Sequence, residues 1–523
     1  MRNRFLIFIA AICASFYGYA QDVPQLIPPS PDQAAINKFG EIPVNYSSGL
    51  IGIDVPLYTI TTKNGLSIPI GLSYHAGGIR VDDIASSVGL GWSLNIGNSI
   101  SATVRGVPDL ATSGMVYDGN TSSNVLPSPS EFDPQNDNDS YQYAYFASNN
   151  IEDSHFDIFH LNFAGRSVKF AIDESRKAHT IPFQPIRIDV LNNAGDDYFK
   201  VYDETGNQFI FDVEETSKVS NDCSTKFNLS DQIFNNYPQT WYLSKIITTD
   251  GEEIDFYYTE YTNSYELSVS ESKSLRPSSS SSQLCPTTAI TTCITEMHIL
   301  KGRQLNKITF NRGMGEVVFT NTTGRNDQGL YKTTEIKVKQ NGSTIRDYSL
   351  TYDHFEGTNT GVTTDDRLKL VSVEEQLSDQ IWAFDYEESV DLPERLSFQQ
   401  DYWGYFNGKS NSTLIPSYSS SEATFSGADR SVDINEAKAY SLKKITYPTG
   451  GYSEFTYESN SYYGAHFITG TVGNHDVGGL RIKQIKSTAD AISPVIIKNI
   501  TYLDTAVQIL WPAQMELQCS IPM

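Results

Sequence analysis

The sequence predicts an all-β protein of stacked antiparallel β-hairpins that form large curled sheets, with little helix. Two observations lead to this prediction. Many short segments alternate apolar and polar residues and are separated by turns that contain glycine. Tyr, with 31 residues, outnumbers Phe and Trp, and Tyr, Thr, Ile and Val all suit half-buried pleated surfaces. Helical periodicity is almost absent, and residues 34–39 provide one turn at most.

Residues 1–20 predict a secretory signal peptide. Two arginines precede an apolar core at 5–14, which is too short to span a bilayer. Small residues at the end of this segment predict cleavage between Ala20 and Gln21. The alternative explanation is a buried N-terminal strand or helix.

A lipoprotein signal that ends at Cys13 is disfavoured, because the bulky Ile12 precedes it. No other stretch of the sequence approaches the length of a membrane span, so we expect none after signal removal. The chain is therefore expected to be secreted or held at the cell surface.

The charge of the chain restricts its partners. The formal net charge is −24, and the signal peptide takes Arg2 and Arg4 with it when it is removed. Such an acidic surface repels phosphate backbones, which argues against nucleic acid as a partner.

The central feature is the stretch 37–109, which contains a predicted hairpin with Asn64-Gly65 at its tip. Asn-Gly favours the two-residue type I′ turn, so Lys63 is expected opposite Leu66. This register places alternate residues of both strands on one mostly apolar face. The expected pairs are Val55 with Tyr74, Leu57 with Leu72, Thr59 with Ile70 and Thr61 with Ile68.

The rest of the chain divides by composition. Further hairpins are expected at 199–212 and around Asn341-Gly342. The tail does not continue the hairpin rhythm, which suggests a truncated or frame-shifted end. The predicted parts are a Pro-rich extended segment at 21–36, an N-terminal β region at 37–261, a flexible Ser-rich insertion at 262–300, a β-hairpin repeat region at 301–505 and an atypical tail at 506–523.

A weak internal repeat runs through the β regions. Each copy has Leu-x-Lys-Ile, a turn with glycine and an aromatic strand, which together describe one hairpin. Copies lie at 241–258, 303–319 and 441–457, with looser copies at 367–386 and from 479 onward. Their uneven spacing argues against a regular solenoid.

Four cysteines follow the signal peptide. Cys285 and Cys293 flank a short loop and form the possible disulfide in an exported chain. Their spacing does not fit a zinc knuckle. Cys223 and Cys519 suggest no definite pairing.

Several segments resemble the N-terminal region of the secreted RHS/YD-repeat proteins of Bacteroidetes. The segments, found between residues 29 and 502, are PSPDQAAINKFGEIPVNYSSG, IDVPLYTI, IPIGLSYHAGGIRVDDIASSVGLGWSLN, VRGVPD, DYWGYFNG, KKITYPTGGYSEFTYE and VGGLRIKQI. The block at 72–94 is the most specific.

The resemblance implies a β-rich exported protein built from hairpins. In the wider family the repeats form a hollow shell, and a variable C-terminal domain can be a toxin. This chain departs from that pattern, because it has no recognisable autoproteolytic core segment or toxin domain. It also has few literal Tyr-Asp repeats, of which Tyr352-Asp353 is one.

His75 is expected to face Asp54 beside Ser73, as an acid–base dyad requires. A surface ion pair is the simpler explanation, because no nucleophile elbow accompanies these residues. The segment Gly89-Leu90-Gly91-Trp92-Ser93 resembles a phosphate loop but lacks its lysine and the following helix. Close backbone packing explains these glycines better.

Two groups of residues have the types that bind metals. Asp153, His155 and Asp157 alternate along a predicted strand and suit a transition metal, although a polar strand entry explains them equally well. A loop contains alternate carboxylates without the glycine and distal glutamate of an EF-hand, and a solvated acidic loop is the default explanation. These loop residues are Asp133, Asp137 and Asp139. We therefore predict no catalytic residue, no metal and no cofactor.

The motif DYWGYFNG supplies a possible ligand platform. Its aromatic residues are Tyr402, Trp403, Tyr405 and Phe406, which could stack on sugar rings or belong to the core.

These observations predict a non-enzymatic exported scaffold. It is expected to be the N-terminal part of an RHS/YD-repeat-like surface or secreted protein that serves assembly, toxin delivery or cell contact. The expected partners are other RHS-like segments and glycans or proteins of the cell surface. The alternative is a carbohydrate- or ligand-binding module of the cell envelope, and a hydrolase is a third hypothesis.

Overall fold

The computed structural model describes residues 42–502 except 97, 106, 112–113, 115, 117–139, 142–144, 146–154, 174, 194–195, 224–236, 276–288, 358–365, 420–422, 466–470 and 491. The chain divides into two compact units, Met1–Glu41 and Ile42–Met523, and every described residue belongs to the second. The predicted signal peptide, its cleavage between Ala20 and Gln21, the Pro-rich segment and the tail 506–523 lie outside the described residues.

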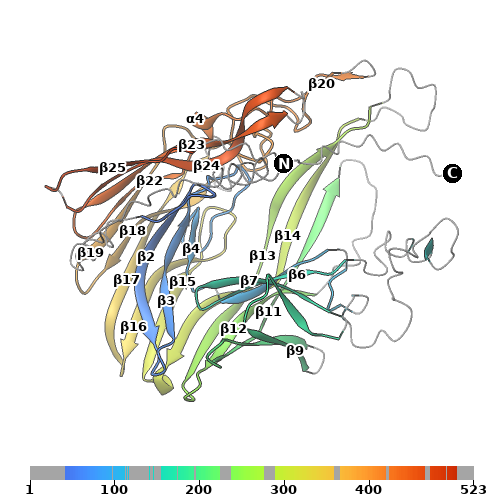
Figure 1. The fold of residues 1–523 in the computed structure, drawn as a ribbon. Helices are drawn as coiled ribbons and strands as arrows, with labels where there is room; N and C mark the ends of the chain where they lie inside the picture. Colours follow the sequence, from blue (N-terminus) through green and yellow to red (C-terminus); the bar gives the residue numbers. More distant parts are fainter. Residues whose placement is uncertain are drawn as a thin grey trace, which may run out of the picture. The chain divides into compact units, whose positions relative to one another are not determined.

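The prediction of an all-β fold is confirmed, and the named strands pair antiparallel as long curved ribbons (Figure 1). The first strands are β1 (Val44–Asn45), β2 (Leu50–Thr61), β3 (Ser67–His75), β4 (Trp92–Leu94), β5 (Ser99–Thr103), β6 (Ile158–Phe163), β7 (Arg166–Ile172), β8 (Ala178–Ile181), β9 (Arg187–Asn193), β10 (Asp196–Tyr202), β11 (Gln208–Cys223) and β12 (Pro238–Ile247).

The remaining strands include the two longest, β13 (Glu253–Ser272) and β14 (Thr291–Phe310), which have 20 residues each. The others are β15 (Gly315–Thr322), β16 (Lys332–Gln340), β17 (Ser343–Phe355), β18 (Arg367–Glu375), β19 (Gln380–Tyr386), β20 (Tyr418–Ser419), β21 (Thr424–Phe425), β22 (Leu442–Thr446), β23 (Tyr452–Ala465), β24 (Val472–Thr488) and β25 (Ile496–Asn499). The named helical elements are the short η1 (Asn311–Gly313) and α4 (Ile434–Ala437).

The described strands form a small sheet, a large sheet and a two-stranded ribbon. The small sheet has the order β1-β2-β3-β4, and the ribbon is β20-β21. In the large sheet the hairpins follow chain order, and β5 joins it by pairing with β12. Strand β11 pairs with β12 through its first part and with β14 through its second. Because β13 pairs with both β12 and β14, these four strands close a circuit.

The predicted register of the first hairpin is wrong. Its tip is a three-residue loop, in which the Thr62 N–H donates to the carbonyl of Leu66 (3.0 Å), rather than a two-residue turn. A bulge at Leu57 shifts the pairing again, so that Val55 faces Leu72 beyond it. The side chains of Thr59 and Thr61 are therefore exposed, whereas Ile60 is buried.

Tertiary contacts distinguish this Asn-Gly tip from the one at Asn341-Gly342. The latter is the expected two-residue turn, with φ of 50° and 79° between the paired Gln340 and Ser343. At the first tip, Asn64 Nδ2 donates to Asn207 Oδ1 (2.7 Å) and to Thr249 Oγ1 (3.2 Å). The tips of three hairpins thus meet, and their contacts favour the longer loop.

The internal repeat corresponds to hairpins, as predicted. Strands β12–β13, β14–β15, β18–β19, β22–β23 and β24–β25 are each paired. In each hairpin an apolar side chain near the turn is at most 4% exposed, which places it in the continuous core. These residues are Ile246, Ile308, Val373, Ile445 and Ile485.

Strands β13 and β14 correct the boundaries of the predicted flexible insertion. Residues 262–272 and 291–300 belong to these two strands, while 276–288 lie outside the described residues. The pairing of β14 with β11 also corrects the expected disulfide. Cys293 faces Cys223 across the two strands and is bonded to it (S–S 2.08 Å), so it cannot also bond Cys285, which lies outside the described residues.

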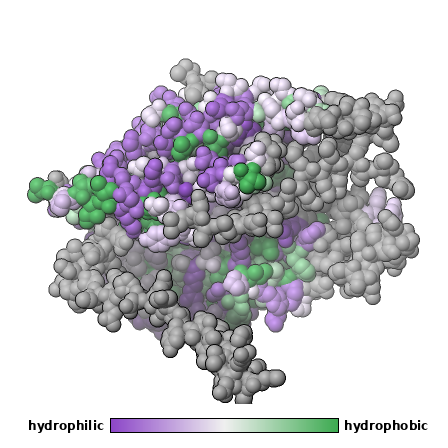
Figure 2. All heavy atoms as spheres, turned by 45° about the horizontal axis from the view of Figure 1, so that its top comes forward, coloured by the Kyte–Doolittle hydropathy of each residue, from purple (hydrophilic) through white to green (hydrophobic). Residues whose placement is uncertain are grey.

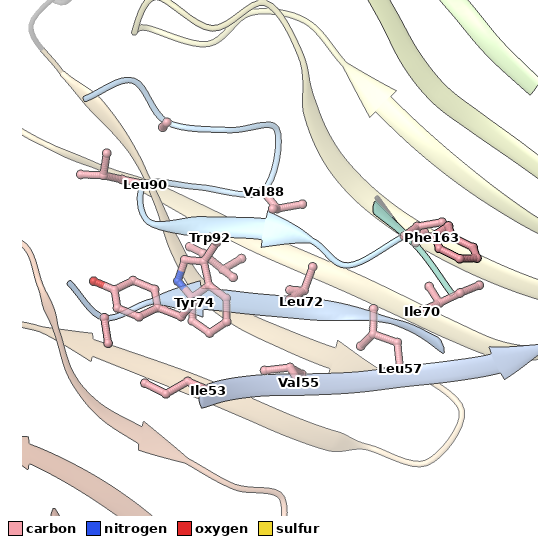
Figure 3. Close-up of a cluster of buried hydrophobic side chains, with 14 of the residues drawn as sticks. Ile53, Val55, Leu57, Ile70, Leu72, Tyr74, Val88, Leu90, Trp92 and Phe163 are labelled. Carbon is pink, nitrogen blue, oxygen red and sulfur yellow. The ribbon is translucent and has the colours of Figure 1, made fainter. Parts of the chain in front are cut away.

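Residues 76–91, which we call the inner segment, cross several hairpins without forming a named strand. Within this segment Leu90 donates to the carbonyl of Leu368 in β18 (2.8 Å), and Ser87 accepts from Thr333 in β16 (2.8 Å). Figure 3 shows Val88 and Leu90 gathered with the side chains of β2, β3 and β4 in one buried cluster. The inner segment therefore connects the small sheet to the large one.

Polar side chains from the large sheet satisfy the backbone of the inner segment. Arg325 donates to the carbonyls of Ala85 (2.9 Å) and Ser86 (2.8 Å), and Arg367 donates to that of Val81 (2.7 Å). Next to the segment, the indole N–H of Trp92 donates to the hydroxyl of Tyr386 (2.8 Å). The hydroxyl in turn donates to the carbonyl of Leu370 (2.7 Å), so both rings are held by hydrogen bonds as well as by burial.

We expect Gly65→Val to destabilise the protein through backbone strain alone. Gly65 has a φ of +88°, and no atom lies within 4 Å of the position that a Cβ would take. A β-branched residue resists this conformation, so the free energy of unfolding should fall by about 1–2 kcal/mol in urea denaturation. Ser67→Val is the control, because it places a valine at one exposed position of β3, where valine is tolerated. It should change stability by less than about 0.5 kcal/mol. Equal stability of the two variants would contradict the turn geometry.

Removal of the disulfide should weaken the circuit of strands. Cys223 and Cys293 are 70 residues apart, and the chain-entropy model gives about 4 kcal/mol for a loop of that length. Cys223→Ser should therefore lower the free energy of unfolding by about that amount, whereas Cys285→Ser should leave it unchanged. Peptide mapping without reductant should find Cys223 linked to Cys293. A peptide linking Cys285 to Cys293 would show that the pairing is wrong.

Candidate functional site

Between β19 and β22 the chain makes a long irregular excursion, residues 387–441, which we call the excursion loop. It carries the DYWGYFNG motif at 401–408 and contacts the inner segment, because the Val81 N–H donates to the carbonyl of Gly404 (2.9 Å). Its helix α4 is capped by Asp433, whose carboxylate accepts from the Asn435 N–H (3.1 Å). The motif is thus held against the inner segment by a backbone hydrogen bond.

The structure does not place the four aromatic side chains of the predicted ligand platform on one exposed face. Tyr405 and Phe406 are buried in the core at 8% exposure each, which corrects their assignment to the platform. Tyr402 and Trp403 are half-buried and meet edge to face, with ring centroids 6.1 Å apart. Trp403 also packs against the core. The motif is therefore mainly a packing element.

Asp401 organises the turn of this motif. It is 1% exposed, and its Oδ1 accepts from the N–H groups of Trp403 (2.8 Å) and Tyr405 (3.0 Å). Its Oδ2 has no hydrogen-bond partner among the described residues, and a Cβ on Gly478 would lie 2.8 Å from it. Burial raises the pKa of Asp401 to about 6, although the backbone N–H donors oppose the shift.

Arg430 lies on the other side of the same turn. Its Nε donates to the carbonyl of Asp401 (3.1 Å), and its Nη1 donates to the carbonyl of Leu414 (2.8 Å). Its Nη2 also donates to the carbonyl of Asp401, and the guanidinium lies 5.2 Å from the ring centroid of Tyr402. Burial lowers the pKa of Arg430, while Tyr402 and Asp401 act against the shift. The guanidinium is thus held in place by carbonyl groups and an aromatic face.

Arg430 opens onto a cleft of about 390 Å³ between the end of β13 and the excursion loop. Lys273 also lines the cleft, and its ammonium lies 5.2 Å from the ring centroid of Phe425. Glu271 supplies a carboxylate, which accepts from Thr292 Oγ1 (2.8 Å) and the Leu414 N–H (2.8 Å). The other lining residues are Val269, Ser270, Ser272, Gln400, Leu414, Ile415 and Pro416. The cleft therefore combines two cations with hydroxyl groups and an apolar wall.

Sequence reasoning missed the polar residues of this site. Asp401 is the first residue of the DYWGYFNG motif, but only the aromatic residues of that motif suggested a function. Arg430 and Lys273 lie in stretches without any motif, and Lys273 falls within the predicted flexible insertion. No local signal identifies them, since only the fold brings β13 to the excursion loop.

The predicted acid–base pair is not formed. His75 faces Gly52 rather than Asp54, because the three-residue tip and the bulge at Leu57 each shift the register by one residue. The carboxylate of Asp54 accepts instead from the hydroxyl of Ser73 on the exposed face (2.5 Å). The glycines at 89 and 91 are explained by close packing, as a Cβ on Gly91 would lie 2.6 Å from the ring of Tyr74.

Only part of the predicted metal residues can be placed. Asp153, Asp133, Asp137 and Asp139 lie outside the described residues. Asp157 is buried, and its carboxylate accepts from the N–H groups of Arg105 (2.8 Å) and Asp109 (2.9 Å), which is a structural role. No cluster of three metal-binding side chains occurs in the described part of the chain. His155, near Asp157, is exposed.

Residues 45–288 match a family model described as SpvB, the Salmonella virulence plasmid 65kDa B protein. The match covers less than half of the chain, so the chain is similar to this family over its N-terminal part. No curated protein matches. Among the described residues, no helix has the length and apolarity needed to cross a membrane.

Several solved structures show a distant likeness to this chain. The crystal structure of TcdB2-TccC3-Cdc42 is 12% identical over 65% of this chain, with a TM-score of 0.34, and the chain spans 16% of its length. The N-terminal domain of the effector protein SpvB from Salmonella typhimurium strain LT2 is 13% identical, covers 62% of this chain and 98% of its own, and has a TM-score of 0.30. The Photorhabdus luminescens Tc holotoxin pore is 11% identical over 65% of this chain and 16% of its own, with a TM-score of 0.33. These low scores carry no functional inference.

We expect the stability of the protein to depend on the protonation of Asp401. Because burial raises its folded-state pKa to about 6, above the unfolded value of about 4, the native state binds a proton more readily. Stability should therefore rise as the pH falls from about 6 towards 4. Asp401→Asn keeps the Oδ1 acceptor but does not titrate. In urea denaturation, the wild type should gain about 1–3 kcal/mol over this variant between pH 7 and pH 4.

Asp385→Asn provides the control for this measurement, because the Asp385 side chain is 64% exposed. The pH dependence of this control should follow that of the wild type. Parallel stability curves for the wild type and Asp401→Asn would show that Asp401 is not shifted.

Proposed function

We propose that this protein is an exported, non-enzymatic scaffold, the N-terminal part of an RHS/YD-repeat-like surface or secreted protein. Its role is assembly, delivery of a toxin or contact between cells. The observation that carries the proposal is the match of residues 45–288 to a family named for a virulence protein. The sequence resemblance to RHS/YD-repeat proteins and the hairpin-built fold support the same assignment.

The polar groups of the structure support a scaffold. The carboxylate of Asp157 and the guanidinium groups of Arg325 and Arg367 are engaged with backbone groups that would otherwise be buried without partners. The residues of the expected acid–base pair do not face each other. This use of charged side chains favours a structural role over hydrolysis.

The strand β25 supports assembly as the form of that role. Apolar side chains of β25 and of the loop before it are exposed to solvent. Ile496 in β25 is 70% exposed, and Ile492 in the loop is 95% exposed. Figure 2 shows hydrophobic residues at this projecting end of β24 and β25 beside a mainly hydrophilic face. Such an edge can accept a further strand through backbone hydrogen bonds, and other RHS-like segments are the partners we propose.

The export part of the proposal is tested by fractionation of bacteria that produce the full chain with a C-terminal epitope tag. The wild type should be found outside the cytoplasm, with Gln21 as its first residue by mass spectrometry. A variant that lacks residues 2–20 should stay in the cytoplasm. Wild-type protein that remains in the cytoplasm with residues 1–20 attached would refute export.

The biological role is tested in the bacterium that encodes the chain. A deletion strain should grow normally alone but lose inhibition of, or attachment to, neighbouring cells, and the intact gene should restore it. A deletion strain that matches its parent in both assays would refute the role. Turnover of ester, peptide or glycoside substrates that survives repurification of the protein would refute the non-enzymatic assignment.

The alternative function is a carbohydrate- or ligand-binding module of the cell envelope. The aromatic motif does not favour it, since Tyr405 and Phe406 are buried. The cleft lined by Arg430 favours a ligand-binding module.

A further inference from the structure

We propose that the cleft between β13 and the excursion loop binds a carboxylate-bearing sugar, such as a uronic acid, with Arg430 as its anchor. The inference goes beyond the scaffold role and does not depend on it, because a chain that failed the export test could still bind. It concerns a different set of residues from the predicted aromatic platform.

The cleft carries positive charge in a strongly acidic chain. Two of its lining residues, Lys273 and Arg430, are cations, whereas Glu271 is its one carboxylate among the described lining residues. Glu271 is engaged by the hydroxyl of Thr413 (2.5 Å), the Leu414 N–H and Thr292, which fixes the end of β13 to the excursion loop. Its oxygens therefore have a structural role, and Glu271 forms no ion pair with Arg430 among the described residues.

Arg430 is prepared for a carboxylate. Its three hydrogen bonds among the described residues go to the carbonyls of Asp401 and Leu414, one from each of its nitrogens. A guanidinium has five N–H groups, so one remains on each terminal nitrogen, which is the number that a carboxylate accepts in a bidentate pair. Arg430 has no ion pair within 4 Å among the described residues. Because its side chain is already ordered, binding costs little additional conformational entropy.

The other walls of the cleft suit a sugar ring rather than a simple anion. Ser270 and Ser272 are exposed residues that line the cleft, and a serine hydroxyl can bond with ring hydroxyls. Ile415 and Pro416 provide an apolar surface for the C–H face of a pyranose. The volume of about 390 Å³ suits a single monosaccharide at the end of a chain.

The test compares two probes that differ at one carbon. D-Glucuronate has a carboxylate where D-glucose has a hydroxymethyl group, so their affinities for the purified full chain separate charge recognition from general sugar binding. In isothermal titration calorimetry, glucuronate should bind saturably and at least about tenfold more tightly than glucose. Acetate, which lacks the ring, should also bind at least about tenfold more weakly.

Two variants test the anchor. Arg430→Gln should reduce the affinity for glucuronate at least about tenfold. Lys273→Gln, which leaves the hydrogen bonds of Arg430 in place, should reduce it severalfold and serves if Arg430→Gln does not fold. Arg187→Gln is the matched control, because Arg187 is an exposed arginine of β9 that lies 3.9 Å from the ring centroid of Tyr202, and its loss changes the net charge equally.

Three results would overturn the proposal. They are equal affinities for glucuronate and glucose, equal affinities for glucuronate and acetate, and glucuronate binding that neither Arg430→Gln nor Lys273→Gln weakens relative to Arg187→Gln. Loss of the export phenotype alone does not bear on this binding, so the failures of the two proposals remain distinguishable.

Discussion

The carbonyl groups of the inner segment are the constraint on which the rest of the structure depends. An irregular segment cannot pair with a neighbouring strand along its whole length, and each buried unsatisfied carbonyl costs about 1–3 kcal/mol. Arg325 in the loop between β15 and β16, Arg367 in β18 and Arg395 in the excursion loop meet this requirement, at distances of 2.7–3.3 Å. They join residues 81–86 to parts of the chain more than 200 positions away. The hairpins are thereby held to one another through a segment that belongs to none of them.

The same physical device recurs at the excursion loop. Arg430 there donates to the carbonyls of Asp401 and Leu414, just as Arg325 and Arg367 donate to carbonyls of the inner segment. A guanidinium is well suited to irregular backbone, because its planar fork reaches several acceptors and stays charged. A carbonyl, unlike a carboxylate, does not neutralise that charge. The hydrogen bonds of Arg430 therefore both hold the excursion loop in place and keep a positive charge at the cleft.

Local patterns predicted the elements well and their relative placement poorly. The hairpins at 199–212, at Asn341-Gly342 and in the internal repeat are present, since turn residues and alternation act within about ten positions. The register at Asn64-Gly65 was wrong because contacts with Asn207 and a bulge at Leu57 override the preference of the turn. The aromatic motif was identified, but Tyr405 and Phe406 belong to the core. Their burial was not predicted, because the sequence of a loop does not show which of its side chains other parts of the chain will cover.

The sequence by itself determined the fold class, the position of most turns and the apolar face of most hairpins. These depend on backbone preferences and on a side-chain period of two, which are properties of neighbouring residues. Only the tertiary structure decided that Cys293 bonds Cys223, that His75 does not meet Asp54 and that Arg430 and Lys273 line one cleft. Each of these depends on which distant strands lie side by side, and that is set by the packing of the whole core rather than by any local preference.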